Sequence, residues 1–222
     1  MAPLTDPVLS TRTFDAVLFD LDGTLIDSTP VVERSWALWA RRRGLDRIGF
    51  AVPHGIPARQ VIASVLPPDQ HEAALAEIEA IEVADVDGIR VLPGALEALA
   101  VLPAGRAAIA TSGSAELARA RIAATGLPAP AVVVTASDVT VGKPDPQPYL
   151  LAAARLGADP ARCLVVEDAP AGITSGTAAG CTTLAVTTTH APGELSADLV
   201  VRSLAEVAFV TGPDGIRLHR QG

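Results

Sequence analysis

Short apolar segments that run directly into polar residues recur along this chain, and they constrain its fold more than any other feature. They span residues 14–19, 106–110, 131–134, 162–166 and 181–186. Each has the length and aliphatic character of a buried strand, and each leads into polar residues such as Asp20, Thr111 or Glu167. The pattern predicts buried strands that end in polar loops.

Helical segments separate these strands. Residues 93–102, 115–125, 147–156 and 170–179 mostly open with Pro or Ser and close at Gly, as helix caps commonly do. Strands that alternate with helices of about ten to fifteen residues predict a parallel sheet with helices on both faces. We therefore expect an α/β fold with a Rossmann-like sheet, in which ligands bind beyond the carboxyl ends of the strands.

The interval from residue 29 to residue 92 breaks this alternation because only helices are expected there. Their predicted ranges are 30–43, 57–65 and 70–81. We expect a core domain made of residues 1–28 and 93–222, with residues 29–92 inserted as a helical cap. A module joined at both ends to the mouth of the sheet is well placed to act as a lid, although a bundle that only adds stability stays an alternative. The tail from residue 211 to residue 222 is expected to be poorly fixed.

Charge and composition exclude several classes of function. The formal net charge is −8 and the pI is about 4.9, whereas nucleic-acid binding needs a basic surface that displaces counterions from phosphates. No apolar run approaches the roughly 20 residues of a membrane span, and residues 1–12 lack the pattern of a secretory signal. We expect a cytoplasmic monomer that binds neither nucleic acid nor membranes.

Two residue types stand out for their rarity. Cys163 and Cys181 each border an apolar run, and we interpret them as small buried hydrophobic residues without a disulfide or a metal role. Among the 17 basic residues, Lys143 is the single lysine and all the others are arginine. So strong a preference for arginine makes Lys143 a candidate functional residue.

Four carboxylates are expected at one edge of the predicted sheet. Asp20 and Asp22 stand two residues apart where the first strand ends, and Glu167 and Asp168 follow a later strand. Carboxylates crowded into a small volume repel one another, and proteins tolerate this mainly where a cation or a shared proton compensates. Hard oxygen ligands that leave room for waters and phosphate oxygens suit Mg²⁺. The sequence therefore predicts a magnesium site beside Lys143.

Four segments in a fixed order carry a resemblance to a known family. They are FDLDGTLIDS at residues 19–28, AIATSGS at 108–114, GKPDPQPYL at 142–150 and VVEDAPAG at 165–172. The chain resembles the haloacid dehalogenase superfamily, a group dominated by phosphatases, from about residue 14 to residue 190. The resemblance implies a Mg²⁺-dependent enzyme that removes phosphate from a small soluble metabolite.

The resemblance also assigns the two reacting carboxyl groups. Asp20 would attack phosphorus to form an aspartyl-phosphate, which divides one difficult displacement into two easier steps. Asp22, kept protonated by its anionic neighbour, would give a proton to the leaving alkoxide and recover one from the attacking water.

The remaining matched residues would hold the metal ion and the phosphate. The resemblance implies that Mg²⁺ is bound by the Asp20 side chain, the Asp22 backbone carbonyl and Asp168, with Glu167 as direct or outer-shell support. Lys143, the Thr111 hydroxyl and the Ser112 amide would contact the phosphoryl oxygens. Gly172 and Gly176 are expected to allow a helix to pack closely against the sheet rather than to contact a ligand.

Other functions known for this superfamily agree with the sequence to different extents. Dehalogenases of this superfamily do not need an acid such as Asp22, and phosphonate hydrolases use a lysine in the lid, whereas residues 29–92 contain none. A phosphomutase similar to the beta-phosphoglucomutases stays open because it uses the same nucleophile, acid and metal. A catalytically silent binding module is the remote alternative.

The predicted lid bears on the choice of substrate. Its segments at residues 54–59 and 85–95 look most like those of small sugar-phosphate and polyol-phosphate phosphatases. His54 and Arg59 are the candidate substrate contacts in this region. We therefore expect the monoester of a small sugar or polyol as the substrate.

Overall fold

The centre of the molecule is a six-stranded, wholly parallel β-sheet, as expected for the α/β class. The computed structural model describes residues 12–45 and 58–220. The strand order is β5-β4-β1-β6-β7-β8, so β1 lies inside the sheet between β4 and β6. The strands are β1 Ala16–Phe19, β4 Ala107–Ala110, β5 Val132–Val134, β6 Cys163–Glu167, β7 Thr182–Val186 and β8 Leu199–Val201.

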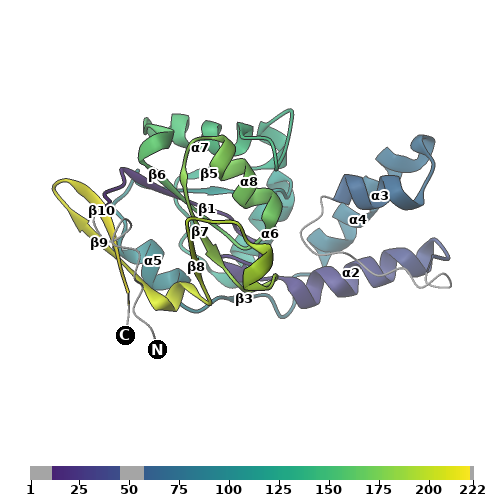
Figure 1. The fold of residues 1–222 in the computed structure, drawn as a ribbon. Coiled ribbons are helices and arrows are strands. Elements are labelled where there is room, and N and C mark those ends of the chain that lie inside the picture. Colours follow the sequence, from purple (N-terminus) through teal and green to yellow (C-terminus); the bar gives the residue numbers. More distant parts are fainter. Residues whose placement is uncertain (1–11, 46–57, 221–222) are drawn as a thin grey trace.

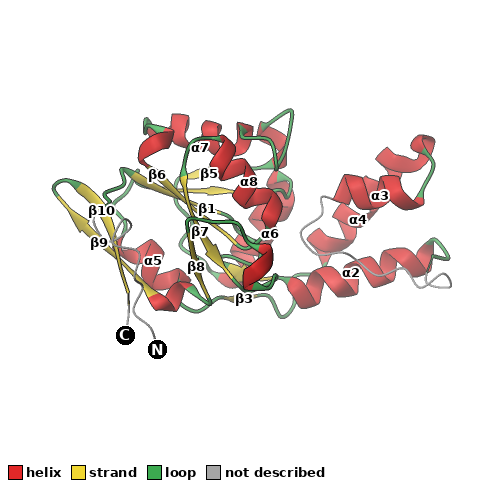
Figure 2. Ribbon diagram, viewed as in Figure 1, coloured by secondary structure: helices red, strands yellow, loops and turns green. Residues whose placement is uncertain are grey.

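Helices cover both faces of this sheet because successive side chains of each strand point to opposite sides. In β1, Val17 and Phe19 belong to the larger apolar cluster, whereas Leu18 belongs to a second cluster that includes Tyr149. Figures 1 and 2 show the sheet between two helical layers. The helices are α5 Ala95–Val101, α6 Ala115–Thr125, α7 Gln147–Leu156 and α8 Pro170–Ala178. The bounds of α6 and α7 are those that the sequence predicts.

The described part of residues 29–92 is helical apart from its connections to the sheet. It contains α2 Thr29–Arg42, α3 Ala58–Val65 and α4 His71–Ala84, which lie beside the sheet body in Figure 1. These helices share an apolar cluster of their own around Trp36 and Trp39, whose ring centroids are 5.2 Å apart. We call residues 29–92 the helical insert. Their division from the rest of the chain as a separate domain stays a prediction.

A short antiparallel ribbon joins the helical insert to the sheet. The chain leaves through β2 Ile26–Asp27 and returns through β3 Arg90–Val91, and Ile26 pairs with Val91. The two connections therefore run side by side rather than apart.

The expectation of a poorly fixed tail is wrong for the residues that the structure describes. β9 Val207–Gly212 and β10 Gly215–Arg220 form an antiparallel hairpin. Ile216 exchanges two backbone hydrogen bonds with Phe14, at 2.8 and 2.7 Å, and its side chain is fully buried. Alternation of apolar residues along β10 places Ile216 and Leu218 in the main core, which fixes the hairpin.

Short 3₁₀ turns complete the connections. They span Pro68–Gln70, Ala136–Asp138, Pro160–Arg162, Pro192–Glu194 and Leu204–Glu206. Within residues 12–45 and 58–220, no helix is both long and apolar enough to cross a membrane.

Candidate active site

Lys143 ties three strands of the sheet together at their carboxyl ends. Its ammonium group donates hydrogen bonds to Asp20 Oδ1 at 2.6 Å, to the carbonyl oxygen of Ala110 at 2.8 Å and to Glu167 Oε1 at 2.6 Å. Burial works against the charged ammonium, but the carboxylates of Asp20 and Glu167 outweigh it and raise the pKa of Lys143. The single lysine is therefore a fixed positive charge beside Asp20.

Glu167 is fully engaged by protein donors. Its Oε1 accepts from Lys143 and from the Tyr149 hydroxyl at 2.8 Å, and its Oε2 accepts from the backbone amides of Asp168 and Ala169. With both oxygens held in this way, Glu167 suits outer-shell support better than direct metal ligation. Tyr149 was not predicted from the sequence to be a site residue.

Asp168 is a buried carboxylate close to Asp20. Its hydrogen-bond partners are Thr24, at 3.4 Å, and the hydroxyl of Thr189 in the loop that follows β7. Burial and the charge of Glu167 raise the pKa of Asp168 to about 7. Burial also raises the pKa of Asp20 well above its usual range, against the opposing effect of Lys143. Both carboxyl groups lack a counter-charge strong enough to offset their desolvation.

The chemistry of this cluster fits a hard divalent cation. One oxygen from each of Asp20, Glu167 and Asp168 lies within 4.8 Å of the others. Three carboxylates and one ammonium leave two uncompensated negative charges when all are ionised, which a divalent cation would balance. Oxygen is the donor that Mg²⁺ prefers. Asp20 and Asp168 are the residues that would bind it through their side chains.

Thr111 follows β4, the strand next to β1, and its hydroxyl is oriented by its own loop. The amide of Gly113 donates to Thr111 Oγ1 at 3.1 Å, which leaves the hydroxyl hydrogen available to another acceptor. Thr111 is buried, whereas the neighbouring Ser112 is exposed. Because β4 pairs with β1 in parallel, both residues lie at the same edge of the sheet as Asp20, which follows β1.

Asp22 faces a different set of partners from Asp20. Its Oδ1 accepts a hydrogen bond from the Ser28 hydroxyl at 2.7 Å, and its Oδ2 pairs with Arg121 at 2.9 Å. Arg121 also contacts Glu82 of the helical insert, at 3.2 Å. Arg121 and Glu82 were not predicted from the sequence, because an arginine and a glutamate on helices normally lie on solvated faces.

Two glycines make room for the acidic side chains. Gly23 has a φ of +86°, and a Cβ atom at this position would lie 2.2 Å from Asp168 Oδ2. A Cβ at Gly172 would lie 1.7 Å from Glu167 Oε1, whereas one at Gly176 would meet Val165 at 2.9 Å. The predicted close packing of α8 therefore has a direct link to the site at Gly172.

Two candidate substrate contacts were predicted in the helical insert. His54 lies outside the described residues. Arg59 belongs to α3 and forms an exposed ion pair with Glu72 at 2.6 Å. A role for either residue in substrate binding stays a prediction.

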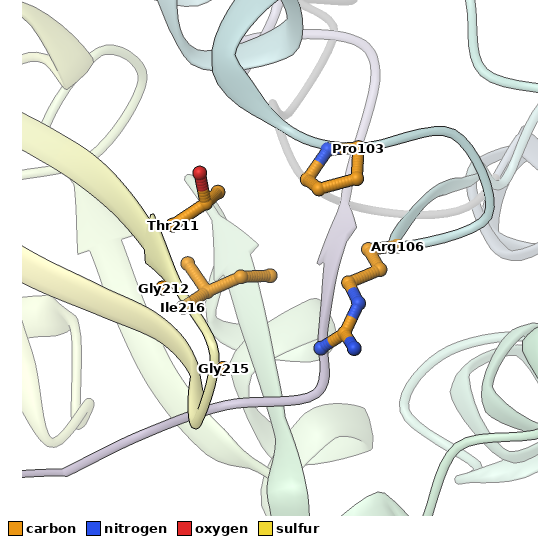
Figure 3. Close-up of a pocket in the computed structure, with 6 residues that line it drawn as sticks. All are labelled: Pro103, Arg106, Thr211, Gly212, Gly215 and Ile216. Atoms are coloured by element: carbon orange, nitrogen blue, oxygen red, sulfur yellow. The ribbon is translucent and has the colours of Figure 1, made fainter.

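Two other features lie away from this edge of the sheet. A hollow between the β9–β10 hairpin and the loop before β4 is lined by Arg106, Ile216 and their neighbours (Figure 3). Because Arg106 precedes β4 and Thr111 follows it, this hollow is at the opposite edge. Cys163 and Cys181 are free and buried, as predicted, and burial raises their thiol pKa values to about 11 and about 12.

Comparisons of the sequence and of the structure with known proteins point to the same family. The sequence profile of the haloacid dehalogenase-like hydrolases matches residues 14–180. Hexitol phosphatase A of Escherichia coli is 48% identical over 211 residues, which cover 89% of this chain and 95% of that protein. Glycerol-1-phosphate phosphohydrolase 2 of Saccharomyces cerevisiae is 37% identical, with coverage of 84% and 79%. The crystal structure of a hydrolase from Pseudomonas syringae superposes with a TM-score of 0.74 at 27% identity, covering 86% of this chain and 94% of that one.

Proposed function

Because the chain belongs to the haloacid dehalogenase-like hydrolases, we propose that it is a Mg²⁺-dependent phosphatase acting on a small sugar or polyol monoester through an aspartyl-phosphate. The observation that carries the proposal is the buried contact of Lys143 with both Asp20 and Glu167, at 2.6 Å each. A carboxylate held beside a fixed cation at a sheet edge is arranged to attack an anionic phosphate.

In the first half of the reaction, a carboxylate oxygen of Asp20 forms a bond to phosphorus as the bond between phosphorus and the ester oxygen breaks. Asp22 gives its proton to the departing ester oxygen, so that an alcohol leaves rather than an alkoxide. Lys143 and the Thr111 hydroxyl stabilise the negative charge on the other phosphoryl oxygens, together with the Ser112 amide.

In the second half, water attacks phosphorus and releases inorganic phosphate and the free Asp20 carboxylate. Asp22 accepts a proton from that water and is ready for the next cycle. Bound Mg²⁺ would reduce the repulsion between the carboxylate of Asp20 and the phosphate dianion. Asp20 and Asp168 would hold the ion through their side chains and Asp22 through its backbone carbonyl, with Glu167 orienting the site from behind.

The relatives support the choice of substrate class. Hexitol phosphatase A and glycerol-1-phosphate phosphohydrolase 2 are named for phosphate esters of polyols, and the chain covers most of both proteins. The proposed substrate is accordingly a small phosphorylated sugar or polyol that enters from the cytoplasm. The helical insert would then serve as the lid that selects it.

The test is release of inorganic phosphate from a panel of sugar and polyol phosphates by the purified protein. We expect Asp20→Asn to remove turnover, by more than about a thousandfold, because a neutral amide replaces the nucleophile while the fold is retained. Asp214→Asn, in the exposed turn of the β9–β10 hairpin, is the matched control and should be as active as the parent protein.

Two further results bear on this proposal. Removal of divalent ions with EDTA should abolish phosphate release, and added Mg²⁺ should restore it. Normal activity in folded Asp20→Asn would refute the aspartyl-phosphate. A phosphomutase, in contrast, would convert beta-glucose 1-phosphate into its isomer without releasing phosphate.

A further inference from the structure

Glu82 is a buried carboxylate of the helical insert that lies close to the reacting groups. It belongs to α4, which packs against α6 of the sheet body (Figure 1). Its side chain is only 10% exposed, and its Oε1 atom accepts a hydrogen bond from the Arg121 guanidinium at 3.2 Å. The same guanidinium contacts Asp22 Oδ2 at 2.9 Å. One guanidinium group therefore separates Glu82 from Asp22.

The second carboxylate oxygen of Glu82 is unpaired. Within residues 12–45 and 58–220, the carboxylate accepts its hydrogen bond from Arg121 through Oε1, and Oε2 accepts none. The buried side-chain atoms without a partner in these residues are Ser35 Oγ and Arg121 Nε, so Glu82 Oε2 keeps access to solvent. Burial raises the pKa of Glu82, against the opposing effect of Arg121. Glu82 therefore presents an acceptor that a ligand can reach.

Arg121 fixes this carboxylate and carries an unpaired donor. Its side chain is only 5% exposed, and so deep a burial of a guanidinium requires the compensating charges that Asp22 and Glu82 supply. Its Nε–H group has no acceptor in the described part of the chain, which is unfavourable for a buried donor. A hydroxyl group both donates and accepts hydrogen bonds, so hydroxyl groups complement both Glu82 Oε2 and Arg121 Nε.

The proposed reaction places the alcohol part of the substrate on this side of the site. The attacking oxygen of Asp20 and the departing ester oxygen lie in line on opposite sides of phosphorus. Asp22, which serves the departing oxygen, is 25% exposed and is one guanidinium group away from Glu82. The carbon chain on that oxygen therefore extends toward Glu82. This placement rests on the proposed function and is independent of the charge state of Asp22.

We propose that Glu82 is a specificity-determining residue whose Oε2 atom accepts a hydrogen bond from a hydroxyl group on the carbon chain of the substrate, with Arg121 holding the carboxylate in place. The inference deepens the proposed phosphatase function and rests on it. An alkyl chain of the same length would exclude water from Glu82 and leave Oε2 without a donor. The insert thus selects esters of polyols and sugars over esters of simple alcohols.

The experiment measures the ratio of kcat/KM for sorbitol 6-phosphate to kcat/KM for hexyl phosphate, which has as many carbon atoms and no hydroxyl group. We expect the parent protein to prefer the first ester by at least about a hundredfold, because a polar site rejects an analogue that lacks the hydrogen-bonding group. In Glu82→Gln the ratio should fall by about tenfold, because a neutral amide that still pairs with Arg121 replaces a charged acceptor. A change in folding, in phosphate binding or in the chemistry at Asp22 would affect both esters alike and leave the ratio as it is.

Glu79→Gln is the matched control, because Glu79 lies one turn earlier on α4 and the substitution removes the same charge. Its ratio should equal that of the parent protein. If Glu82→Gln does not fold, Glu82→Leu combined with Arg121→Leu removes both charges together and leaves neither of them buried and unpaired. In this double variant the ratio should fall by about tenfold or more. If hexyl phosphate reacts too slowly to measure, p-nitrophenyl phosphate, whose ring carries no hydroxyl group, takes its place.

A parental ratio in the folded Glu82 variant would overturn the role of Glu82 while leaving the phosphatase intact. The same holds if the parent protein hydrolyses the ester without hydroxyl groups as efficiently as sorbitol 6-phosphate. If the parent protein released phosphate from none of the three esters, the proposed function itself would fail. The two failures are therefore distinguishable in one set of measurements.

Discussion

The carboxylate of Glu167 occupies the space in which a side chain at position 172 would stand. It is held there by Lys143, Tyr149 and two backbone amides, and Glu167 is only 1% exposed. Its end group therefore cannot swing aside as a glutamate carboxylate on a surface would. At this position the helix α8 depends on the absence of a Cβ atom.

We expect Gly172→Ala to destabilise the protein by about 1–3 kcal/mol, the usual effect of overpacking a filled site. The helix propensity of alanine, worth about 1 kcal/mol over glycine, opposes the clash but does not offset it. Phosphate release should fall as well, because displacement of Glu167 also displaces Lys143. Urea unfolding and the phosphate assay measure the two effects.

Gly193→Ala is the control, since a Cβ atom there would meet nothing within 4 Å and the φ angle is not positive. It should change stability by less than about 0.5 kcal/mol. Parental stability and activity in Gly172→Ala would show that the Glu167 carboxylate is free to move.

At the scale of the elements, the hairpin β9–β10 closes the end of the main apolar cluster. Ile216 contributes a fully buried side chain to that cluster, next to Phe14. We expect Ile216→Ala to lower the free energy of unfolding by about 2–5 kcal/mol, because it removes buried methyl and methylene groups and leaves a cavity. Chemical denaturation followed by circular dichroism measures this value.

Val210→Ala on the paired strand is the comparison, because Val210 is 46% exposed. Its effect should stay within about 0.5 kcal/mol. A similarly small effect of Ile216→Ala would mean that the hairpin is not part of the cooperative core.

The sequence predicted most of these elements because their signals are local. Strand and helix bounds agree to within about two residues for the predicted core elements, and the residues of the four motifs meet at one edge of the sheet, as parallel strands require. The sixth strand, β8, was not predicted because it has only three residues and because residues 187–198, which precede it, contain a 3₁₀ turn but no α-helix, so the alternation of strands and helices ends there. The hairpin was not predicted because its turn, Gly-Pro-Asp-Gly at residues 212–215, has the composition of a disordered chain terminus.

The residues that contact the predicted site residues could not be predicted from the sequence. Arg121 lies in the middle of α6 and Tyr149 lies in the first turn of α7, and nothing in their local pattern distinguishes them from a solvated arginine and a packed aromatic residue. Their roles arise from contacts with Asp22 and Glu167, which belong to distant parts of the chain. Such pairings depend on tertiary structure, for which a single sequence carries no signal.

For the whole molecule, the acidic cluster links metal binding, stability and pH. In the metal-free protein the pKa of Asp168 rises from 3.8 to about 7, so the folded state binds this proton more tightly than the unfolded chain does. Stability of the metal-free protein should therefore decrease as the pH rises from about 4 to about 7. We expect a divalent cation bound by Asp168 to replace this proton and to restore the lost stability.

We expect Mg²⁺ to raise the melting temperature more at pH 8 than at pH 6, because at pH 6 protonation of Asp168 competes with the metal ion. The apparent affinity should fall by up to about tenfold for each pH unit below 7. Differential scanning calorimetry with and without Mg²⁺ at both pH values checks this.

The shift should disappear in Asp168→Asn and persist in Asp214→Asn, whose changed residue lies in the exposed hairpin turn. An equal rise in melting temperature at the two pH values in the parent protein would contradict the assignment of Asp168 as a ligand.

The ribbon formed by β2 and β3 has a consequence for how such a protein can diversify. Since the two strands are paired where the chain departs and returns, one continuous stretch of gene encodes everything that lies beyond them. A recombination event or a designed graft between Ile26 and Val91 can exchange that stretch while β1 and β4 keep their places. On the proposed role of the helical insert as a lid, such an exchange would alter substrate preference, whereas Asp20, Thr111, Lys143 and Asp168 lie outside the exchanged stretch and would be retained.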